Sequence, residues 1–315
     1  MNERVPATSA VITGAGGFIG DALVSELLDS GYQVHAIVRP GSTRGKELEH
    51  NGAHVVPCDL ADTGRLATMI DAPCDVFLHC GWQGTARVQR ADAKAQIANI
   101  SSTLAAVEVA ASLGCTSFIG VGSQAEYGNA DGVLAPDSPT IPTTFYGAAK
   151  LGACHFSRLR ARELGMRHIW ARLFSVYGPC DHEDTLVMSV VHALLEGRSP
   201  RLTSCDQLWD YLFRDDAALA LRCICEQGRD GAVYCVGSGI ARPLADYVEM
   251  IRDAVNPAVE LRFGEIAQAP SRATHLEADV SALFADTGFV PRVPFETGIR
   301  RTVDWCVAHR GGQLR

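Results

Sequence analysis

The sequence lacks a long apolar run, an excess of basic residues and any paired cysteine motif. No uninterrupted apolar run approaches the roughly 18 residues that a membrane-spanning helix needs. Residues 1–8 lack the apolar stretch and the small-residue cleavage site of a secretory signal. Acidic residues outnumber Lys and Arg by 36 to 28, which argues against binding to nucleic acid or to an anionic membrane. We therefore expect a cytoplasmic protein with neither kind of partner.

The cysteines and acidic clusters do not indicate a metal site. The 11 cysteines are an odd number without any C-x-x-C pair. Cys223 and Cys225 lie closest together, and their alternation suits one side of an amphipathic segment at least as well as a metal. The run of Cys, Asp, His, Glu and Asp at 180–184 offers ligands, but consecutive residues rarely converge on one ion. We expect buried free thiols and no bound metal.

The chain of 315 residues, 47% of them hydrophobic, has enough apolar material for a sizeable core. Its first half alternates short β-branched runs with longer amphipathic stretches, which is typical of a doubly wound α/β fold with helices on both faces of a parallel sheet. We expect strands at 9–13, 33–38, 54–56, 75–80, 117–121 and 168–173. We expect helices at 18–30, 60–70, 91–113 and 146–164.

After about residue 179 the alternation weakens into mixed short elements. Helices are expected at 185–196, 244–255 and 296–308, and strands at 201–203, 211–213 and 233–236. No low-complexity linker separates the two parts. We therefore predict a dinucleotide-binding domain at 1–178 and a smaller mixed α/β region at 179–315 that mainly binds substrate, with the ligand site between them.

A glycine-rich turn joins the first expected strand to the first expected helix. Its glycines allow a tight turn, close approach to a pyrophosphate and close packing of helix on strand, and the helix N-terminus supplies N–H donors. With a second strand about 20 residues further on, the pattern predicts a dinucleotide bound to a Rossmann fold. The expected contacts in this turn are Gly14, Gly17, Phe18, Ile19 and Gly20.

The end of the second strand bears on the choice of cofactor. Enzymes that prefer NAD usually carry an acid there, which accepts hydrogen bonds from the ribose hydroxyls. Here the residue is Arg39, whose guanidinium can bind a 2′-phosphate or stack on adenine. The sequence thus favours NADP(H), with NAD as the alternative. Asp59 and Leu60, after the third strand, are expected at the adenine edge.

Tyr146 and Lys150 are four residues apart, on one face of an expected helix. An ammonium beside a phenol favours the phenolate, so the tyrosine can exchange a proton with an alcohol or a carbonyl. Ser123 lies just beyond the fifth strand, where its hydroxyl could bind the same substrate oxygen. We predict that these three residues are catalytic and that Tyr146 and Lys150 also contact the cofactor.

Together these motifs resemble the extended short-chain dehydrogenase/reductase superfamily, in particular its nucleotide-sugar epimerase/dehydratase branch. The resemblance spans nearly the whole chain through the loop at 13–20, Asn99, the segment 172–179, the Asp pair at 215–216 and a stretch that ends at Trp305. It implies that Asn99 is a structural residue on the cofactor side and that a sugar nucleotide binds between the two parts. Cys80 and Gly81, after the fourth strand, are also expected to contact the cofactor.

Departures from the family pattern narrow the expected chemistry. In the 4,6-dehydratases of this branch, an Asp and a Glu follow the Ser or Thr; they protonate the leaving hydroxyl and remove the C5 proton. Here the two residues are Gln124 and Ala125, neither of which can act as an acid or a base. Dehydration by that route is not expected. Glu126 follows one position later, and we expect it to have a structural partner in its loop.

The segment 122–128, together with Trp82, resembles keto-sugar reductases related to CDP-abequose synthase, which reduce a C4 ketone on a deoxy sugar. Ser175 replaces an Asn that commonly contacts substrate, and Trp209 stands where many relatives have an arginine. Arg272 matches another arginine that binds the diphosphate. The resemblance therefore implies these substrate contacts: Trp82, Gln124, Ser175, Trp209 and Arg272.

Three functions remain open at this point. The leading prediction is NADPH-dependent reduction of a 4-keto-6-deoxy nucleotide sugar, with Tyr146 as the proton donor. The alternative is an NAD-dependent nucleotide-sugar 4-epimerase, which oxidises and re-reduces one carbon. A non-catalytic sensor of NADP redox state is disfavoured because the three catalytic residues are retained.

An apolar stripe runs along the helix expected at 91–113. It is made of Ile97, Ile100, Leu104, Val107 and Ala111. Such a stripe can belong to the core, but in this superfamily the corresponding helix often pairs with its twofold mate. We predict a homodimer whose interface includes Ile100 and Leu104.

Overall fold

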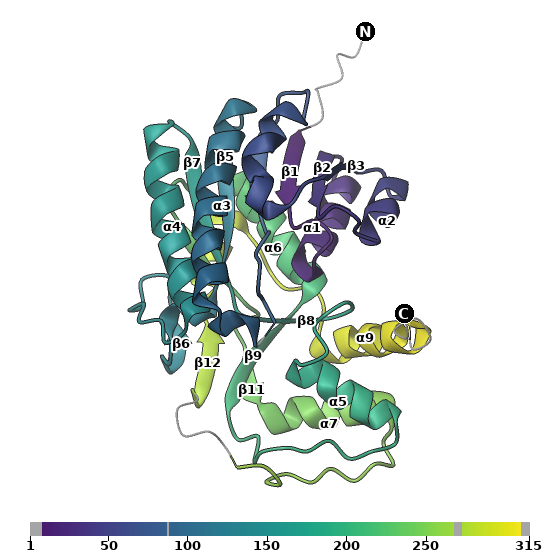
Figure 1. Ribbon diagram of the computed structural model, residues 1–315. Coiled ribbons are helices and arrows are strands. Elements are labelled where there is room, and N and C mark those ends of the chain that lie inside the picture. The colour runs from purple at the N-terminus through teal and green to yellow at the C-terminus, as the bar shows by residue number, and fades with distance from the viewer. Residues whose placement is uncertain (1–7, 87, 268–272, 310–315) are drawn as a thin grey trace.

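A seven-stranded parallel sheet forms the upper part of the molecule in Figure 1. The computed structural model describes residues 8–86, 88–267 and 273–309. The strands lie in the order β10-β7-β5-β4-β1-β2-β3, so the direction of winding reverses between β1 and β4. Their bounds are β1 Ser9–Thr13, β2 Gln33–Val38, β3 His54–Pro57, β4 Val76–His79, β5 Ser117–Ser123, β7 Arg167–Leu173 and β10 Val233–Val236.

Helices cover both faces of this sheet, as the sequence predicted. In β1, Ala10 and Ile12 pack in one core cluster with Leu27 of α1. Val11 points the other way, into a second cluster with Val107 of α3. The sheet is therefore buried on both faces, which explains the continuous apolar runs of its strands. The helices are α1 Phe18–Asp29 and α6 Arg214–Gln227, which pack together, α3 Ala93–Ser112 and α4 Phe145–Glu163, which pack together, and α2 Arg44–His50 beside β3.

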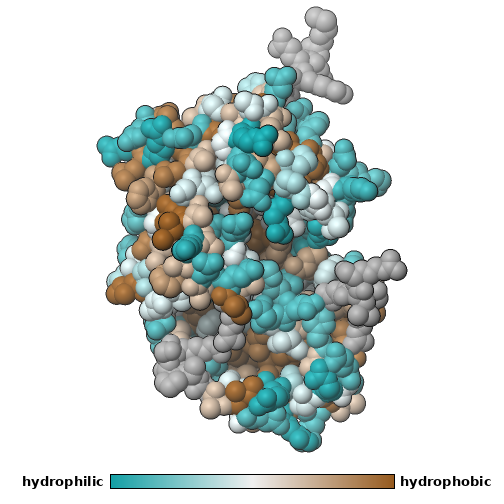
Figure 2. All heavy atoms as spheres, viewed as in Figure 1, coloured by the Kyte–Doolittle hydropathy of each residue, from teal (hydrophilic) through white to brown (hydrophobic). Residues whose placement is uncertain are grey.

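A smaller mixed sheet lies below the first, in the order β11-β9-β12-β6, and β8 pairs with β9. An aromatic cluster around Tyr177, Phe213, Tyr247 and Phe295 fills the space between these strands and their helices. The elements are β6 Gly132–Leu134, β8 Ser175–Tyr177, α5 Leu186–Leu195, β9 Leu208–Phe213, β11 Ala241–Pro243, α7 Leu244–Val255, β12 His275–Ala278, α8 Ser281–Thr287 and α9 Phe295–His309. In Figure 2 the surface is hollowed between the upper and lower parts.

The helix expected at 60–70 is present as the 3-10 helix η1 Leu60–Thr68, with a break at Asp62. The structure differs from the sequence prediction in another segment. Residues 201–203 form no strand: Leu202 is buried in the lower core, and the backbone bonds of this segment go to a loop at 264–266. One apolar side chain in an otherwise polar run is not enough to place a strand in a sheet.

The chain crosses between the two parts more than once. β10 and α6 follow residue 179 in sequence, but both pack with the seven-stranded sheet. β6 precedes residue 179, but it belongs to the lower sheet. The division at 178/179 stays a prediction. In the structure, each of the two sheets contains strands from both sides of that position.

Candidate active site

The glycine turn after β1 is shaped by close backbone contacts. Gly14 has a φ of +69°, and a Cβ added there would lie 2.7 Å from the Cα of Gly81. A Cβ added to Gly20 would collide with the carbonyl oxygen of Gly14. Among the described residues, no side chain caps the N-terminus of α1. The first N–H groups of α1, around Phe18 and Ile19, are therefore available to bind a pyrophosphate. The turn as a whole fits a dinucleotide.

Three polar residues surround the other side of this turn. Arg39 is exposed just beyond β2. A Cβ built on Gly16 would lie 3.3 Å from Ser42 Oγ and 3.4 Å from Arg44 Cβ. Sequence analysis identified only Arg39; Ser42 and Arg44 could have been found as a hydroxyl and a second cation within a few residues of the strand end.

The turn after β4 lies against the glycine turn. Gly81 donates its N–H to Thr13 Oγ1 at 3.2 Å, and a Cβ on Gly81 would lie 2.6 Å from Leu60 Cδ2. Asp59 caps the N-terminus of η1, because its carboxylate accepts the Ala61 N–H at 3.0 Å. Burial raises the pKa of the neighbouring Cys80 thiol to about 12. The expected cofactor residues after β1, β3 and β4 thus meet at one edge of the sheet.

The three predicted catalytic residues also converge here. Ser123 ends β5, and Tyr146 and Lys150 lie in the first two turns of α4. The side chain of Tyr146 is hydrogen-bonded to that of Ser123. Lys150 Nζ donates to the carbonyl oxygen of Val121 at 2.6 Å. Both α4 residues are buried, so a reaction at this point would take place largely away from water.

Burial shifts both titratable groups towards their neutral forms. It raises the pKa of Tyr146, while the charge of Arg90 and the hydrogen bond with Ser123 oppose that rise. It lowers the pKa of Lys150 to about 7, and the charge of Glu126 opposes that fall. At neutral pH, Tyr146 is therefore a protonated phenol.

Arg90 lies at this site although the sequence did not point to it. It lies in the short 3-10 helix η2 Gln89–Ala91, and its guanidinium carbon is 4.7 Å from the centre of the Tyr146 ring. Lys150 Nζ is 6.0 Å from the same point. Arg90 is therefore the cation stacked on the tyrosine, a place that the sequence interpretation gave to Lys150. Only the folded loop brings it there.

Trp82 forms a wall of this site. Its indole ring lies 3.7 Å from Lys150 Nζ and meets the Tyr146 ring edge-on at 6.1 Å. The indole N–H donates to Gln96 Oε1 at 2.9 Å. Asn99 holds the next residue of the loop, since it accepts the Gln83 N–H at 2.8 Å and donates back to the Gln83 carbonyl. These bonds fit the structural role expected for Asn99, and its place on the cofactor side stays a prediction.

The remaining expected substrate residues lie in two places. Gln124 is half-buried beside Ser123, at the start of the 3-10 helix η3 Gln124–Tyr127. Trp209 donates its indole N–H to Ser175 Oγ at 2.7 Å, between β9 and β8. Ser123 pairs with Leu173 in the sheet, so Ser175 lies two residues beyond the level of Ser123. Arg272 lies outside the described residues.

The acid that follows these positions has structural partners, as the sequence predicted. Glu126 is fully buried and accepts hydrogen bonds from the main chain of Ser123 and from the side chains of Trp170 and Arg172. Neither Gln124 nor Ala125 supplies an acid. Among the residues after Ser123 in η3, the only carboxylate is therefore tied to the protein interior.

Most of the cysteine side chains are buried, as predicted. Within the described ranges, no group of three or more His, Cys, Asp or Glu side chains is arranged to hold a metal ion. In that same part of the chain, no helix has the length and apolarity needed to cross a membrane.

Comparison with known proteins gives a consistent result. A model of the NAD dependent epimerase/dehydratase family matches residues 10–237. The chain is similar to dTDP-glucose 4,6-dehydratase of Salmonella typhimurium, with 25% identity over 336 residues that cover 95% of this chain and 92% of the relative. A dTDP-glucose 4,6-dehydratase of Escherichia coli is 30% identical over 182 residues, which cover 56% of this chain and 49% of the relative.

Solved structures show the same fold. A UDP-glucose 4-epimerase of Thermotoga maritima, solved with UDP-glucose, superposes with a TM-score of 0.84 at 21% identity and covers 96% of this chain and 100% of its own. A dTDP-glucose 4,6-dehydratase of Streptomyces venezuelae, solved with NAD, gives a TM-score of 0.84 at 23% identity, with 96% and 98% covered. At these identities the likeness establishes the arrangement of strands and helices.

Proposed function

This chain belongs to the NAD dependent epimerase/dehydratase family, and from that premise we propose that it reduces the C4 ketone of a 6-deoxy nucleotide sugar with NADPH. It is an enzyme of the extended short-chain dehydrogenase/reductase type. The observation that carries the proposal is the geometry of the site, in which Tyr146 and Lys150 are buried near the end of β5 and neither of the two residues after Ser123 is an acid. Burial also raises the pKa of Tyr146, which favours its phenol form. A reductase begins its cycle by donating a proton to the carbonyl oxygen, which requires the phenol.

Each catalytic residue has one task in this reaction. Ser123 binds the carbonyl oxygen of the sugar, and Tyr146 donates its proton to that oxygen as the alkoxide develops. Lys150 is assigned to the ribose of the cofactor and to the charge balance around Tyr146. Gln124 and Ala125 cannot protonate a leaving hydroxyl, so the sugar keeps its remaining hydroxyl groups.

The proposed cofactor is NADPH, and when bound it would supply a hydride. The glycine turn and the uncapped start of α1 would hold its pyrophosphate. Arg39 would bind the 2′-phosphate, with Ser42 and Arg44 on the same side of the turn. An acid in place of Arg39 would have repelled that phosphate, which is why we prefer NADPH to NAD.

The test supplies 4-keto-6-deoxy nucleotide sugars and follows the absorbance of NADPH. We expect stoichiometric loss of NADPH and formation of a 6-deoxy sugar nucleotide. Thermal shifts with CDP-, dTDP-, UDP- and GDP-sugars would identify the preferred nucleotide, since the bound ligand stabilises the native state. Absence of NADPH oxidation with every keto sugar would overturn the proposal.

A nucleotide-sugar 4-epimerase that retains NAD is the second candidate. The Thermotoga structure that shares this fold is a UDP-glucose 4-epimerase. A 4-epimerase that oxidises and re-reduces one carbon consumes no net cofactor. Interconversion of two nucleotide sugars without net NADPH consumption would establish this function instead. A non-catalytic redox sensor is the least favoured candidate, since Ser123, Tyr146 and Lys150 are present and assembled.

We also propose a homodimer as the working form and keep the cytoplasm as its predicted location. The surface formed by α3 and α4 is the proposed dimer face. It presents exposed apolar side chains on both helices: Ile97, Phe156 and Leu159.

A further inference from the structure

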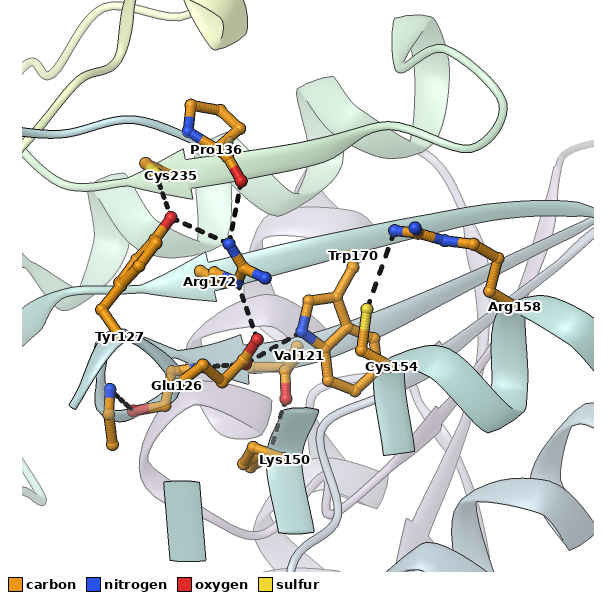
Figure 3. Close-up of polar contacts among 12 residues, drawn as sticks. Val121, Glu126, Tyr127, Pro136, Lys150, Cys154, Arg158, Trp170, Arg172 and Cys235 are labelled. Atoms are coloured by element: carbon orange, nitrogen blue, oxygen red, sulfur yellow. Dashed lines mark hydrogen bonds and ion pairs between the residues drawn. The ribbon is translucent and has the colours of Figure 1, made fainter. Parts of the chain in front are cut away.

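Glu126 is a buried carboxylate directly behind the catalytic serine. Its Oε1 accepts the main-chain N–H of Ser123 at 2.9 Å and the indole N–H of Trp170 at 3.0 Å. Its Oε2 accepts the Nε–H of Arg172 at 2.7 Å. The carboxylate is fully buried and fully partnered, as Figure 3 shows. Such a group costs a large desolvation free energy, which only a complete set of partners offsets.

Arg172 is held equally firmly on the other side. Its guanidinium donates from one terminal nitrogen to the Tyr127 hydroxyl and to the Pro136 carbonyl, both at 3.0 Å. The guanidinium carbon also lies 4.7 Å from the centre of the Tyr127 ring. The position of Glu126 is therefore fixed by β7, from which Arg172 extends, and not by its own short helix alone.

The end of β5 packs directly on this carboxylate. A Cβ added to Gly122 would collide with both Trp170 Nε1 and Glu126 Oε1. On the opposite side, Lys150 Nζ holds the Val121 carbonyl at 2.6 Å. The last residues of β5, Val121 to Ser123, thus lie between Lys150 and the Glu126 carboxylate.

We propose that Glu126 is a positioning residue of the active site, which orients Ser123 through its main-chain N–H and provides the buried negative charge that balances Lys150. The proposal rests on the proposed function in one respect, the roles of Ser123 and Lys150. Its physical basis is the geometry above, in which the buried side chains of Lys150 and Glu126 both contact the main chain of residues 121–123. In a medium of low dielectric constant, such a pair interacts far more strongly than it would at the surface.

Charge balance at Lys150 has a measurable consequence. Burial lowers the pKa of Lys150 to about 7, and the negative charge of Glu126 opposes this fall. Removing that charge should lower the pKa further, so the ammonium would be lost at a lower pH. The other charged or titratable groups that face Lys150 are Tyr146 on α4, Arg90 on η2, and His79 and Cys80 at the end of β4.

The first experiment measures the pH dependence of NADPH binding by fluorescence titration, in the full-length protein without substrate. The variant is Glu126→Gln with Arg172→Met, which removes both charges and keeps an acceptor for Ser123. We expect affinity to fall as pH rises through the Lys150 pKa, with a midpoint at lower pH than in the wild type, because Glu126 acts on Lys150 more strongly than the Arg172 behind it does. Ionisation of NADPH itself is common to both proteins and cancels in the comparison.

Two further variants make the result decisive. Glu126→Leu with Arg172→Met replaces the pair by apolar side chains, a change that buried ion pairs often tolerate, and it should shift the midpoint equally. Asp210→Asn is the matched control, because Asp210 is a buried carboxylate that accepts from Ser238, Gly239 and Ala278 elsewhere in the fold. It should lower the melting temperature and leave the midpoint unchanged. An unshifted midpoint in both double variants would overturn the proposal.

The second experiment tests the orientation of Ser123. The Leu/Met variant removes the acceptor for the Ser123 N–H, so kcat at the optimum pH should fall roughly tenfold to a hundredfold with little change in KM for NADPH. The Gln/Met variant, which keeps the acceptor, should restore most of kcat. Equal kcat in the two variants would overturn this part of the proposal. If the wild type fails to turn over keto sugars, the proposed function falls, while the NADPH midpoint still decides the role of Glu126 towards Lys150.

Discussion

Tyr146 is the residue on which the proposed chemistry depends most directly. Tyr146→Phe should keep the ring packed against Trp82 and remove the only hydroxyl assigned to protonate the alkoxide. General acid catalysis contributes roughly 10²- to 10⁴-fold, so kcat should fall by about that factor. NADPH affinity, measured by fluorescence, should change little. Unchanged turnover in this variant would remove Tyr146 from the mechanism.

Arg90 adds a prediction about pH. Burial raises the pKa of Tyr146, and the Arg90 charge lowers it. Reduction needs the protonated phenol, so activity is lost as pH rises through this pKa. Arg90→Leu should therefore move the alkaline loss of kcat to higher pH, whereas Arg90→Lys should move it less. The exposed Arg162, at the far end of α4, is the control: its replacement by Leu should leave the profile in place, and an equal shift there would contradict the prediction.

Arg39 is the residue on which the proposed preference for NADPH over NADH depends. Its side chain is exposed beyond β2, so Arg39→Ala should not disturb the core. Loss of a charge-assisted contact should weaken NADPH binding by about 1.5 to 3 kcal/mol and NADH binding much less. Calorimetric titration of both cofactors measures the difference. Equal weakening of the two, or a wild type that prefers NADH, would contradict the NADP assignment.

At the scale of elements, the junction of β1 and α1 tolerates no side chain larger than hydrogen at Gly20. A Cβ on Gly20 would collide with the Gly14 carbonyl, which is backbone and cannot move aside. Gly20→Ala should therefore cost about 2 kcal/mol or more in the free energy of unfolding and abolish tight NADPH binding. Gly64, in η1, has open space around it and serves as the control. Gly64→Ala should change stability by less than about 0.5 kcal/mol in denaturant titrations.

The elements also show how far sequence reasoning extends. Central strands of the upper sheet such as β1 and β4 could be predicted because they are buried on both faces and read as nearly continuous apolar runs. The convergence of Ser123, Tyr146 and Lys150 could be predicted because spacing along α4 and the end of β5 follows from element geometry. Arg90 and the partners of Glu126 could not, since Arg90 reaches Tyr146 from a separate loop and Arg172 reaches Glu126 from β7. Contacts of that kind depend on tertiary packing alone.

At the scale of the whole molecule, the apolar stripe of α3 divides between two surroundings. Val107 is buried in the core cluster on one face of the sheet. Ile100 is only partly buried, and it packs beside Trp82 and Trp170, close to Gly152 of α4. Leu104 is also half-buried. The interface predicted around Ile100 and Leu104 therefore needs the outermost side chains of α3 and α4 to complete it.

Those outermost side chains motivate the last prediction. Ile97 of α3 is 63% exposed, and Phe156 and Leu159 of α4 are 54% and 61% exposed, on two helices that pack side by side. Figure 2 shows apolar side chains on this side of the molecule. Single exposed apolar residues are common, but a cluster on neighbouring helices is typical of a protein interface. A twofold axis between two copies would bury the cluster against itself.

Light scattering at micromolar concentration should give the mass of a dimer for the wild type. Phe156→Glu with Leu159→Glu should give a monomer, because the twofold axis would bring like charges together in a desolvated patch. The melting temperature of the wild-type dimer should depend on protein concentration, and that of the monomeric variant should not. Phe284→Glu, at an equally exposed apolar side chain on α8, should remain a dimer. A monomeric wild type would contradict the prediction, and a dimer that survives the α4 substitutions would place its interface elsewhere.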